Sequence, residues 1–145
     1  MKKFILMLMM AVSLTASATD GTTKADLEKK WGSVIDAIAQ VESKKNPKVV
    51  SKDGRYVGYL QISEILVRQC NIIAGYKKYT YKDRYDKQKS IDMFIDFQEK
   101  YNPEGNYEKA IRLWNSGDLN CMNRKARTEG YFRRVMSKFS ETASL

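Results

Sequence analysis

Glu42 is the residue whose position in this sequence best suits acid–base chemistry. It lies at the end of an apolar stretch with helical periodicity, directly before a polar segment that contains Gly54 and Gly58. Apolar surroundings disfavour the ionised form of a carboxyl group and raise its pKa. A carboxyl group that stays protonated can act as a general acid, as the cleavage of a glycosidic bond requires. The alternative is a solvated glutamate at a helix end, and the neighbouring motifs decide between the two.

The composition excludes several other kinds of catalysis. The 145 residues include no histidine and only two cysteines. Histidine-based catalysis, the common histidine-containing zinc sites and a four-thiolate metal centre are therefore ruled out. No cluster of ligand side chains indicates a metal, and we expect neither a metal nor a cofactor. The groups left for chemistry are carboxylates, hydroxyls, amides, tyrosine, tryptophan and lysine.

The first 18 residues have the features of a signal peptide. Lys2 and Lys3 precede an apolar run over residues 4–12, and Ala16-Ser17-Ala18 has the small-x-small pattern of a cleavage site. The run is about half of the roughly 20 residues that span a bilayer, so we expect no transmembrane anchor. We predict cleavage after Ala18, one domain over residues 19–145, and a periplasmic or extracellular location.

Export has a consequence for the two cysteines. Cys70 and Cys121 would lie in an oxidising compartment and could form one disulfide, which we expect to form. Two separate buried thiols are the alternative.

The chain is basic, with 26 Lys and Arg against 17 Asp and Glu. A basic surface favours polyanionic partners, which outside the cytoplasm are cell-wall polymers and membrane surfaces. The lysines are dispersed along the chain, so nucleic acid is not an expected partner.

Hydrophobic positions recur with a helical period along most of the chain, which predicts a mainly helical single domain. The first helix starts at a capping box formed by Thr23 and Asp26 and ends at about Glu42 or Ser43. Residues 51–62 hold glycines among β-branched and aromatic residues, which is typical of a loop or a short hairpin. Caps and stops predict further helices over residues 63–73, 86–101 and 106–114, and one that opens at Thr128.

Several motifs follow one another in a fixed order around these elements. They are Glu42-Ser43, Asn46-Pro47, Ser51, Gly58-Tyr59-Leu60-Gln61-Ile62, Leu113-Trp114-Asn115-Ser116-Gly117 and, in the last helix, Tyr131. This order resembles the lytic transglycosylase family, of the soluble, goose-lysozyme-like type, over roughly residues 34–139. Two departures stand out: Trp114 replaces the usual tyrosine, and Tyr59-Leu60 replaces the usual Leu-Met pair.

The resemblance implies a lysozyme-like fold, with a short hairpin after the helix that ends at Glu42, and cleavage of peptidoglycan. The bond cut would be that between N-acetylmuramic acid and N-acetylglucosamine, with Glu42 protonating the leaving oxygen. The same carboxylate would then accept the proton of the muramoyl C6 hydroxyl, which attacks the anomeric carbon and leaves an anhydro sugar. The implied substrate-binding residues are Ser51, Tyr59, Gln61, Trp114, Asn115 and Tyr131. The implied partners are glycan strands and, as a further candidate, a cell-envelope apparatus, and we expect a monomer.

Each of these residues also has a purely structural interpretation. Ser51 suits a turn, Asn115 suits a helix end, and Trp114 and Tyr131 suit the core of a small helical domain. Gln61 stands between apolar neighbours, where a glutamine is unusual for the core, so a function is favoured there.

Two other functions stay open at this stage. A lysozyme-type hydrolase of the inverting kind needs a second carboxylate roughly 6.5–9.5 Å from the first. Asp53 is the best candidate for it, although an aspartate before Gly54 is expected to cap a turn. A non-catalytic peptidoglycan-binding module is the other alternative.

Overall fold

Helix α1 (Lys24–Ser43) carries Glu42 in its last turn and contacts α3, α4 and α5. The computed structural model describes residues 21–142, with side chains through Phe139. The other elements are β1 (Tyr56–Val57), β2 (Ile62–Ser63), α2 (Glu64–Ala74), α3 (Lys87–Tyr101), α4 (Tyr107–Ser116) and α5 (Glu129–Thr142), with short 3₁₀ helices η1 (Tyr81–Tyr85), η2 (Cys121–Asn123) and η3 (Lys125–Thr128). The prediction of a mainly helical domain with one short hairpin is confirmed. The predicted signal peptide, residues 1–18, lies outside the described residues.

Helix α1 begins where its capping box places it. The Thr23 hydroxyl accepts a hydrogen bond from the Asp26 amide at 3.2 Å, and the Asp26 carboxylate accepts one from the Thr23 amide at 2.9 Å. Two of the unpaired amides at the helix start are satisfied in this way. The apolar face of α1 is almost completely buried, with Trp31, Val34 and Ile38 at 0% exposure. The helix ends at Lys44, which adopts the left-handed conformation with φ of 52°.

Helices α2, α3 and α4 start at the polar caps that the sequence predicts. Ser63 accepts from the amide of Leu66 at 3.2 Å, and Asp86 accepts from the amide of Lys89 at 2.8 Å. Helix α4 runs two residues beyond its predicted end at Trp114, because Gly117, and not Asn115, takes the left-handed conformation that ends it. Asn115 therefore lies on a helix.

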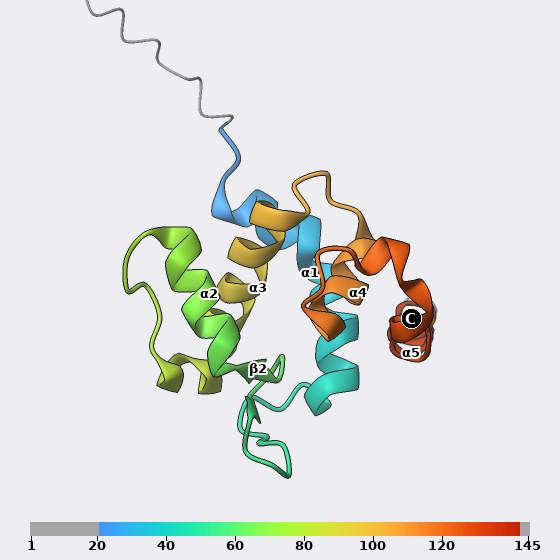
Figure 1. Ribbon diagram of the computed structural model, residues 1–145, viewed down its shortest axis with the longest axis horizontal. Helices are drawn as coiled ribbons and strands as arrows, with labels where there is room; N and C mark the ends of the chain where they lie inside the picture. Colours follow the sequence, from blue (N-terminus) through green and yellow to red (C-terminus); the bar gives the residue numbers. More distant parts are fainter. Residues whose placement is uncertain (1–20, 143–145) are drawn as a thin grey trace, which may run out of the picture.

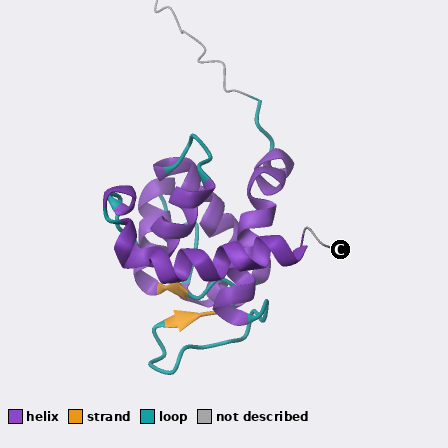
Figure 2. Cartoon of the chain, turned by 90° about the vertical axis from the view of Figure 1, so that its right-hand side faces the viewer, coloured by secondary structure: helices purple, strands orange, loops and turns teal. Residues whose placement is uncertain are grey.

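The helices divide into two groups on either side of α1. Helix α2 packs against α3, whereas α4 and α5 pack against each other and against α1. Figure 1 shows α2 at the left of the molecule and α5 at the right, with the hairpin below them. Strands β1 and β2, the orange arrows of Figure 2, pair antiparallel. Tyr56 lies opposite Ser63, and Val57 lies opposite Ile62. None of the helices described here is long and apolar enough to cross a bilayer.

The disulfide predicted between Cys70 and Cys121 is absent, and both thiols are free and buried. Cys70 lies on α2, with its Sγ 3.5 Å from the carbonyl oxygen of Met93 on α3. Cys121 begins η2, which packs against α4. Burial raises the pKa of Cys70 to about 12, so the thiolate needed for thiol–disulfide exchange is scarce. The alternative of two separate buried thiols describes the structure.

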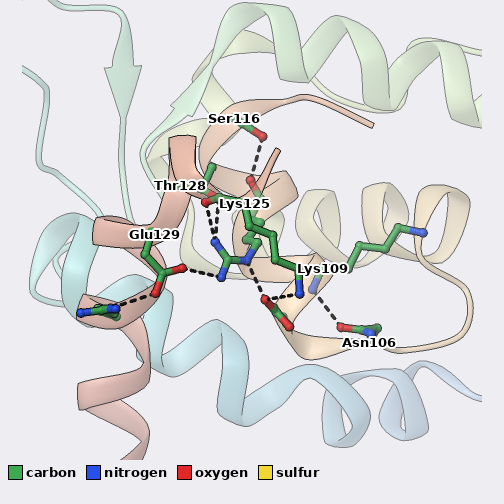
Figure 3. Close-up of polar contacts among 9 residues, drawn as sticks. Asn106, Lys109, Ser116, Lys125, Thr128 and Glu129 are labelled. Atoms are coloured by element: carbon green, nitrogen blue, oxygen red, sulfur yellow. Dashed lines mark hydrogen bonds and ion pairs between the residues drawn. The ribbon is translucent and has the colours of Figure 1, made fainter. Parts of the chain in front are cut away.

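The guanidinium of Arg112 ties α4 to the last part of the chain. The Arg112 side chain is 3% exposed and donates to Glu108 on its own helix at 2.9 Å. It also donates to the Lys125 carbonyl at 2.9 Å, to the Thr128 hydroxyl at 3.0 Å and to the Glu129 carboxylate at 2.8 Å. Figure 3 shows Lys125, Thr128 and Glu129 converging on this contact. One buried cation therefore fixes where η3 ends and α5 begins.

We expect Arg112→Leu to lower the free energy of unfolding by about 3 kcal/mol, because Glu108 and Glu129 lose the cation that pairs with both. Urea denaturation measures the change. Arg124→Leu is the matched control, since Arg124 is 53% exposed in its ion pair with Asp118, and its effect should stay below about 1 kcal/mol. Equal effects of the two substitutions would contradict the anchoring role of Arg112.

Candidate active site

A cleft of about 680 Å³ opens beside the end of α1. Glu42 lines it from α1, and the other walls come from the hairpin, α2, α3 and the end of α4. The lining residues are Tyr56, Gln61 and Ser63 of the hairpin, Ile65, Leu66 and Gln69 of α2, Phe97 and Tyr101 of α3, and Leu113, Trp114, Asn115, Ser116, Gly117 and Leu119 from α4 onward. Within residues 21–142, Glu42 is the single carboxylate among them.

Glu42 is partly buried and bound by Tyr131. The Tyr131 hydroxyl, on α5, donates to Glu42 Oε1 at 2.6 Å. Burial raises the pKa of Glu42 above its ordinary value, while the hydrogen bond from Tyr131 and the charge of Arg134 act in the opposite direction. Burial is the largest of these effects, so the protonated form is favoured. Oε2 accepts no hydrogen bond from the side chains described here, which leaves it available to a ligand.

The chain after Glu42 is held close to the end of α1 by short contacts. The Ser43 hydroxyl is buried and donates to the Tyr59 carbonyl at 2.8 Å. Gly58 has a φ of 83°, and a Cβ there would lie 1.8 Å from the carbonyl oxygen of Arg84. Only glycine fits at such an approach. Gln61 Nε2 donates to the carbonyls of Val49 and Gly58, each at 3.0 Å, so this glutamine holds the turn of the hairpin while it lines the cleft.

Trp114 and Asn115 reach the cleft from the last turns of α4. Trp114 Nε1 donates to the Leu60 carbonyl at 3.3 Å, and its ring packs on Phe94 with centroids 4.9 Å apart. Trp114 is therefore both a core residue and a wall of the cleft. Asn115 is exposed and lines the cleft beside it.

Ser51 and Tyr59 do not line the cleft. The Ser51 hydroxyl donates to Asp53 at 2.7 Å and accepts from the Tyr56 amide at 3.0 Å, so it shapes the loop before β1. Tyr59 is 3% exposed and packs in the core, with the Lys87 ammonium group 5.1 Å from the centre of its ring. The Tyr59 ring therefore does not border the cleft beside Glu42.

Asp53, considered above as a second carboxylate, also lies away from the cleft. It pairs with Arg55 at 2.6 Å and caps the turn before that residue. Hydrogen bonds from Ser51 and Arg55 lower the pKa of Asp53 to about 2. No group of three or more carboxylates and thiols in the described chain is arranged to hold a metal ion.

Sequence reasoning missed most of the wall formed by α2 and α3. The sequence pattern of these two helices predicts that their inward faces belong to the ordinary core. The residues of this wall are Leu66, Gln69, Phe97 and Tyr101. The available signal was Gln69, a polar residue between Leu66 and Ile73 on the side of α2 that packs against the core. Which of these positions borders a cavity depends on how two helices meet, and periodicity does not carry that information.

The fold and the cleft together define a class. A small helical domain in which a core helix delivers a partly buried glutamate to a cleft beside a short hairpin is lysozyme-like. Residues 22–135 match the family model described as the transglycosylase SLT domain, and the chain belongs to this family. Its members are generally lytic transglycosylases, which cleave glycosidic bonds in peptidoglycan. No curated protein and no solved structure matches the chain.

We expect Tyr131→Phe to raise the pKa of Glu42 further, because the variant loses the hydrogen bond that favours the ionised carboxylate. A carbon-13 NMR titration of the glutamate carboxyl groups measures this pKa. Tyr56→Phe is the matched control, since Tyr56 lines the same cleft without a hydrogen bond to Glu42. A pKa that stays the same or falls in Tyr131→Phe would show that the hydrogen bond does not stabilise the charge.

We also expect Glu42→Gln to gain stability relative to the wild type as the pH rises. The pKa of Glu42 is higher in the folded chain than its ordinary value of 4.5. The wild type therefore loses stability as the pH rises from below that value through the raised pKa, whereas glutamine does not ionise. Unfolding free energies of both proteins at about pH 4 and about pH 7.5 give the comparison. If the unfolding free energy of Glu42→Gln minus that of the wild type falls from low to high pH, the buried-acid interpretation is contradicted.

Proposed function

We propose that this protein is a peptidoglycan lytic transglycosylase, a lyase, that uses Glu42 as general acid and then as general base. The observation that carries the proposal is the state of Glu42. It is partly buried, it accepts a hydrogen bond from Tyr131, and its side chain supplies the cleft with its single carboxylate among the described residues. The family membership gives the class of bond, and Glu42 supplies a group able to break it.

In the first step, Glu42 donates its proton to the oxygen between N-acetylmuramic acid and N-acetylglucosamine. The bond from that oxygen to the muramoyl anomeric carbon breaks, and the carbon gains oxocarbenium character. Tyr131 stabilises the carboxylate that this step leaves behind, because its hydroxyl already donates to Oε1. Oε2, which has no partner among the described side chains, is the oxygen free to carry the proton.

In the second step, the C6 hydroxyl of the same muramoyl residue attacks the anomeric carbon. Glu42 accepts the hydroxyl proton and returns to its acid form, so protons balance over the cycle. The product carries a 1,6-anhydro bond, and no water is consumed. One carboxylate is sufficient for this route, whereas an inverting hydrolase needs a second carboxylate to activate water. The position of Asp53 outside the cleft favours the transglycosylase over that hydrolase.

The walls of the cleft suit a glycan strand. Trp114 presents an aromatic ring, which can pack on the apolar face of a sugar. Asn115 and Gln61 add amide groups that can hydrogen-bond to substrate, although Gln61 Nε2 already holds the hairpin. We assign Ser51 to the shape of the loop, through its bonds to Asp53 and Tyr56.

We further propose that the protein is exported and acts as a monomer on the cell wall. Peptidoglycan lies outside the cytoplasm, and the first 18 residues have the pattern of a signal peptide. We also propose that it works with a cell-envelope apparatus. The basic composition of the chain would attract it to anionic surfaces there.

The test is mass spectrometry of purified peptidoglycan after incubation with the mature protein and with Glu42→Gln. We expect anhydro-muramoyl ends from the wild type and a loss of roughly 10²- to 10⁴-fold in rate with Glu42→Gln. Glu28→Gln, at a position on the same helix that does not line the cleft, is the matched control and should retain activity.

Two results would overturn parts of this proposal. Reducing ends in place of anhydro ends would make the protein a hydrolase. Binding without release, unchanged by Glu42→Gln, would make it a non-catalytic peptidoglycan-binding module.

A further inference from the structure

One wall of the cleft holds a pair of polar side chains between apolar ones. Gln69 on α2 and Tyr101 on α3 line the cleft together with Leu66 and Phe97. Gln69 Nε2 donates to the Tyr101 hydroxyl at 2.6 Å. The Tyr101 ring is held in turn by an edge contact with Phe97, with centroids 5.0 Å apart. The two polar groups are therefore fixed relative to each other before any ligand arrives.

This hydrogen bond uses one of the two amide N–H groups of Gln69 and leaves Gln69 Oε1 free to accept and the Tyr101 hydroxyl free to donate. Neither makes a further hydrogen bond with the described chain. In that same part of the chain, no buried side-chain nitrogen or oxygen lacks a partner. Gln69 Oε1 is consequently open to the cleft and not sealed in the core.

An acetamido group is the ligand whose chemistry matches this wall. It has one N–H to donate to Gln69 Oε1, one carbonyl to accept from the Tyr101 hydroxyl, and a methyl group for an apolar surface such as Leu66 and Phe97. A carboxylate has no N–H to donate to Gln69 Oε1, and an ammonium group cannot accept a hydrogen bond from Tyr101. Neither of them uses the apolar surface.

We propose that Gln69 and Tyr101 form a subsite that recognises the 2-acetamido group of a sugar in the glycan strand. This inference rests on the proposed function, since it assumes that a glycan occupies the cleft. It adds the source of selectivity: the α2–α3 wall distinguishes N-acetylated sugars from sugars whose amino group is free. If the hydrogen bond between Gln69 and Tyr101 only joined α2 to α3, it would not discriminate between such substrates.

The test compares cleavage of N-acetylated peptidoglycan with cleavage of the same polymer after chemical de-N-acetylation. We expect Gln69→Met and Tyr101→Phe each to lower kcat/KM for the acetylated polymer by about tenfold or more, because a bound amide group loses its partner. On the de-N-acetylated polymer the change should be less than about threefold, so the selectivity ratio falls. Equal losses on both polymers, or no change in the ratio, would overturn the subsite.

Tyr76→Phe is the matched control, since it removes a hydroxyl from a tyrosine that is 65% exposed and does not line the cleft. Thermal unfolding of every variant separates lost recognition from lost stability.

A binding measurement keeps the subsite testable apart from catalysis. Glu42→Gln should bind a tetramer of N-acetylglucosamine more tightly than a tetramer of glucosamine, and adding Gln69→Met should remove that preference. If the wild type cleaves neither polymer, the proposed function fails, and this comparison decides the subsite by itself. Binding of both tetramers with equal affinity would overturn the subsite even where cleavage is observed.

Discussion

In its proposed role, Glu42 has to be withdrawn from water and still remain accessible to a ligand, and much of the fold serves that constraint. A carboxyl group sealed in the core could not contact a ligand, and one on the surface would keep an ordinary pKa. Helix α1 meets both conditions, because it buries most of its apolar face and ends one residue after Glu42. Tyr131 then covers one carboxyl oxygen, and the cleft lies beside the residue. The position of the acid thus depends on where a helix of the core stops.

The partner of Glu42 comes from the other end of the chain, so the site is only as well ordered as α5. Tyr131 lies on this helix two residues after Glu129, which pairs with the buried guanidinium of Arg112. Arg112 lies on α4, two residues before Trp114, which forms part of the cleft wall. A single side chain therefore couples the helix that carries the aromatic wall to the helix that carries the tyrosine. Burying an arginine is costly, and this one is retained with its hydrogen bonds to Glu108, Lys125, Thr128 and Glu129.

The helices and their ends could be predicted because their signals are local. Thr23, Ser63 and Asp86 cap helices in the structure as they do in the sequence pattern, and Gly75 and Gly117 end them. Glu42, Gln61, Trp114 and Asn115 line one cleft because they belong to motifs that flank these ends. Tyr59 does not line the cleft, because strand-like spacing does not say which side chains of a hairpin face it. Gln69 and Tyr101 were missed because they meet across two helices. The predicted disulfide between Cys70 and Cys121 was wrong because the packing of segments far apart in the sequence determines whether two cysteines meet.

The pKa of Glu42 has to suit two opposite steps of the proposed reaction. In the proposed mechanism, Glu42 holds a proton when the glycosidic bond breaks and accepts one when the C6 hydroxyl attacks. Burial alone would raise the pKa of Glu42 further and so disfavour the carboxylate that the first step leaves behind. The hydrogen bond from Tyr131 and the charge of Arg134, which lies over the Tyr131 ring, limit the rise that burial causes. A carboxyl group that serves in turn as acid and base needs a pKa that is raised but restrained, and the residues around Glu42 act in both directions.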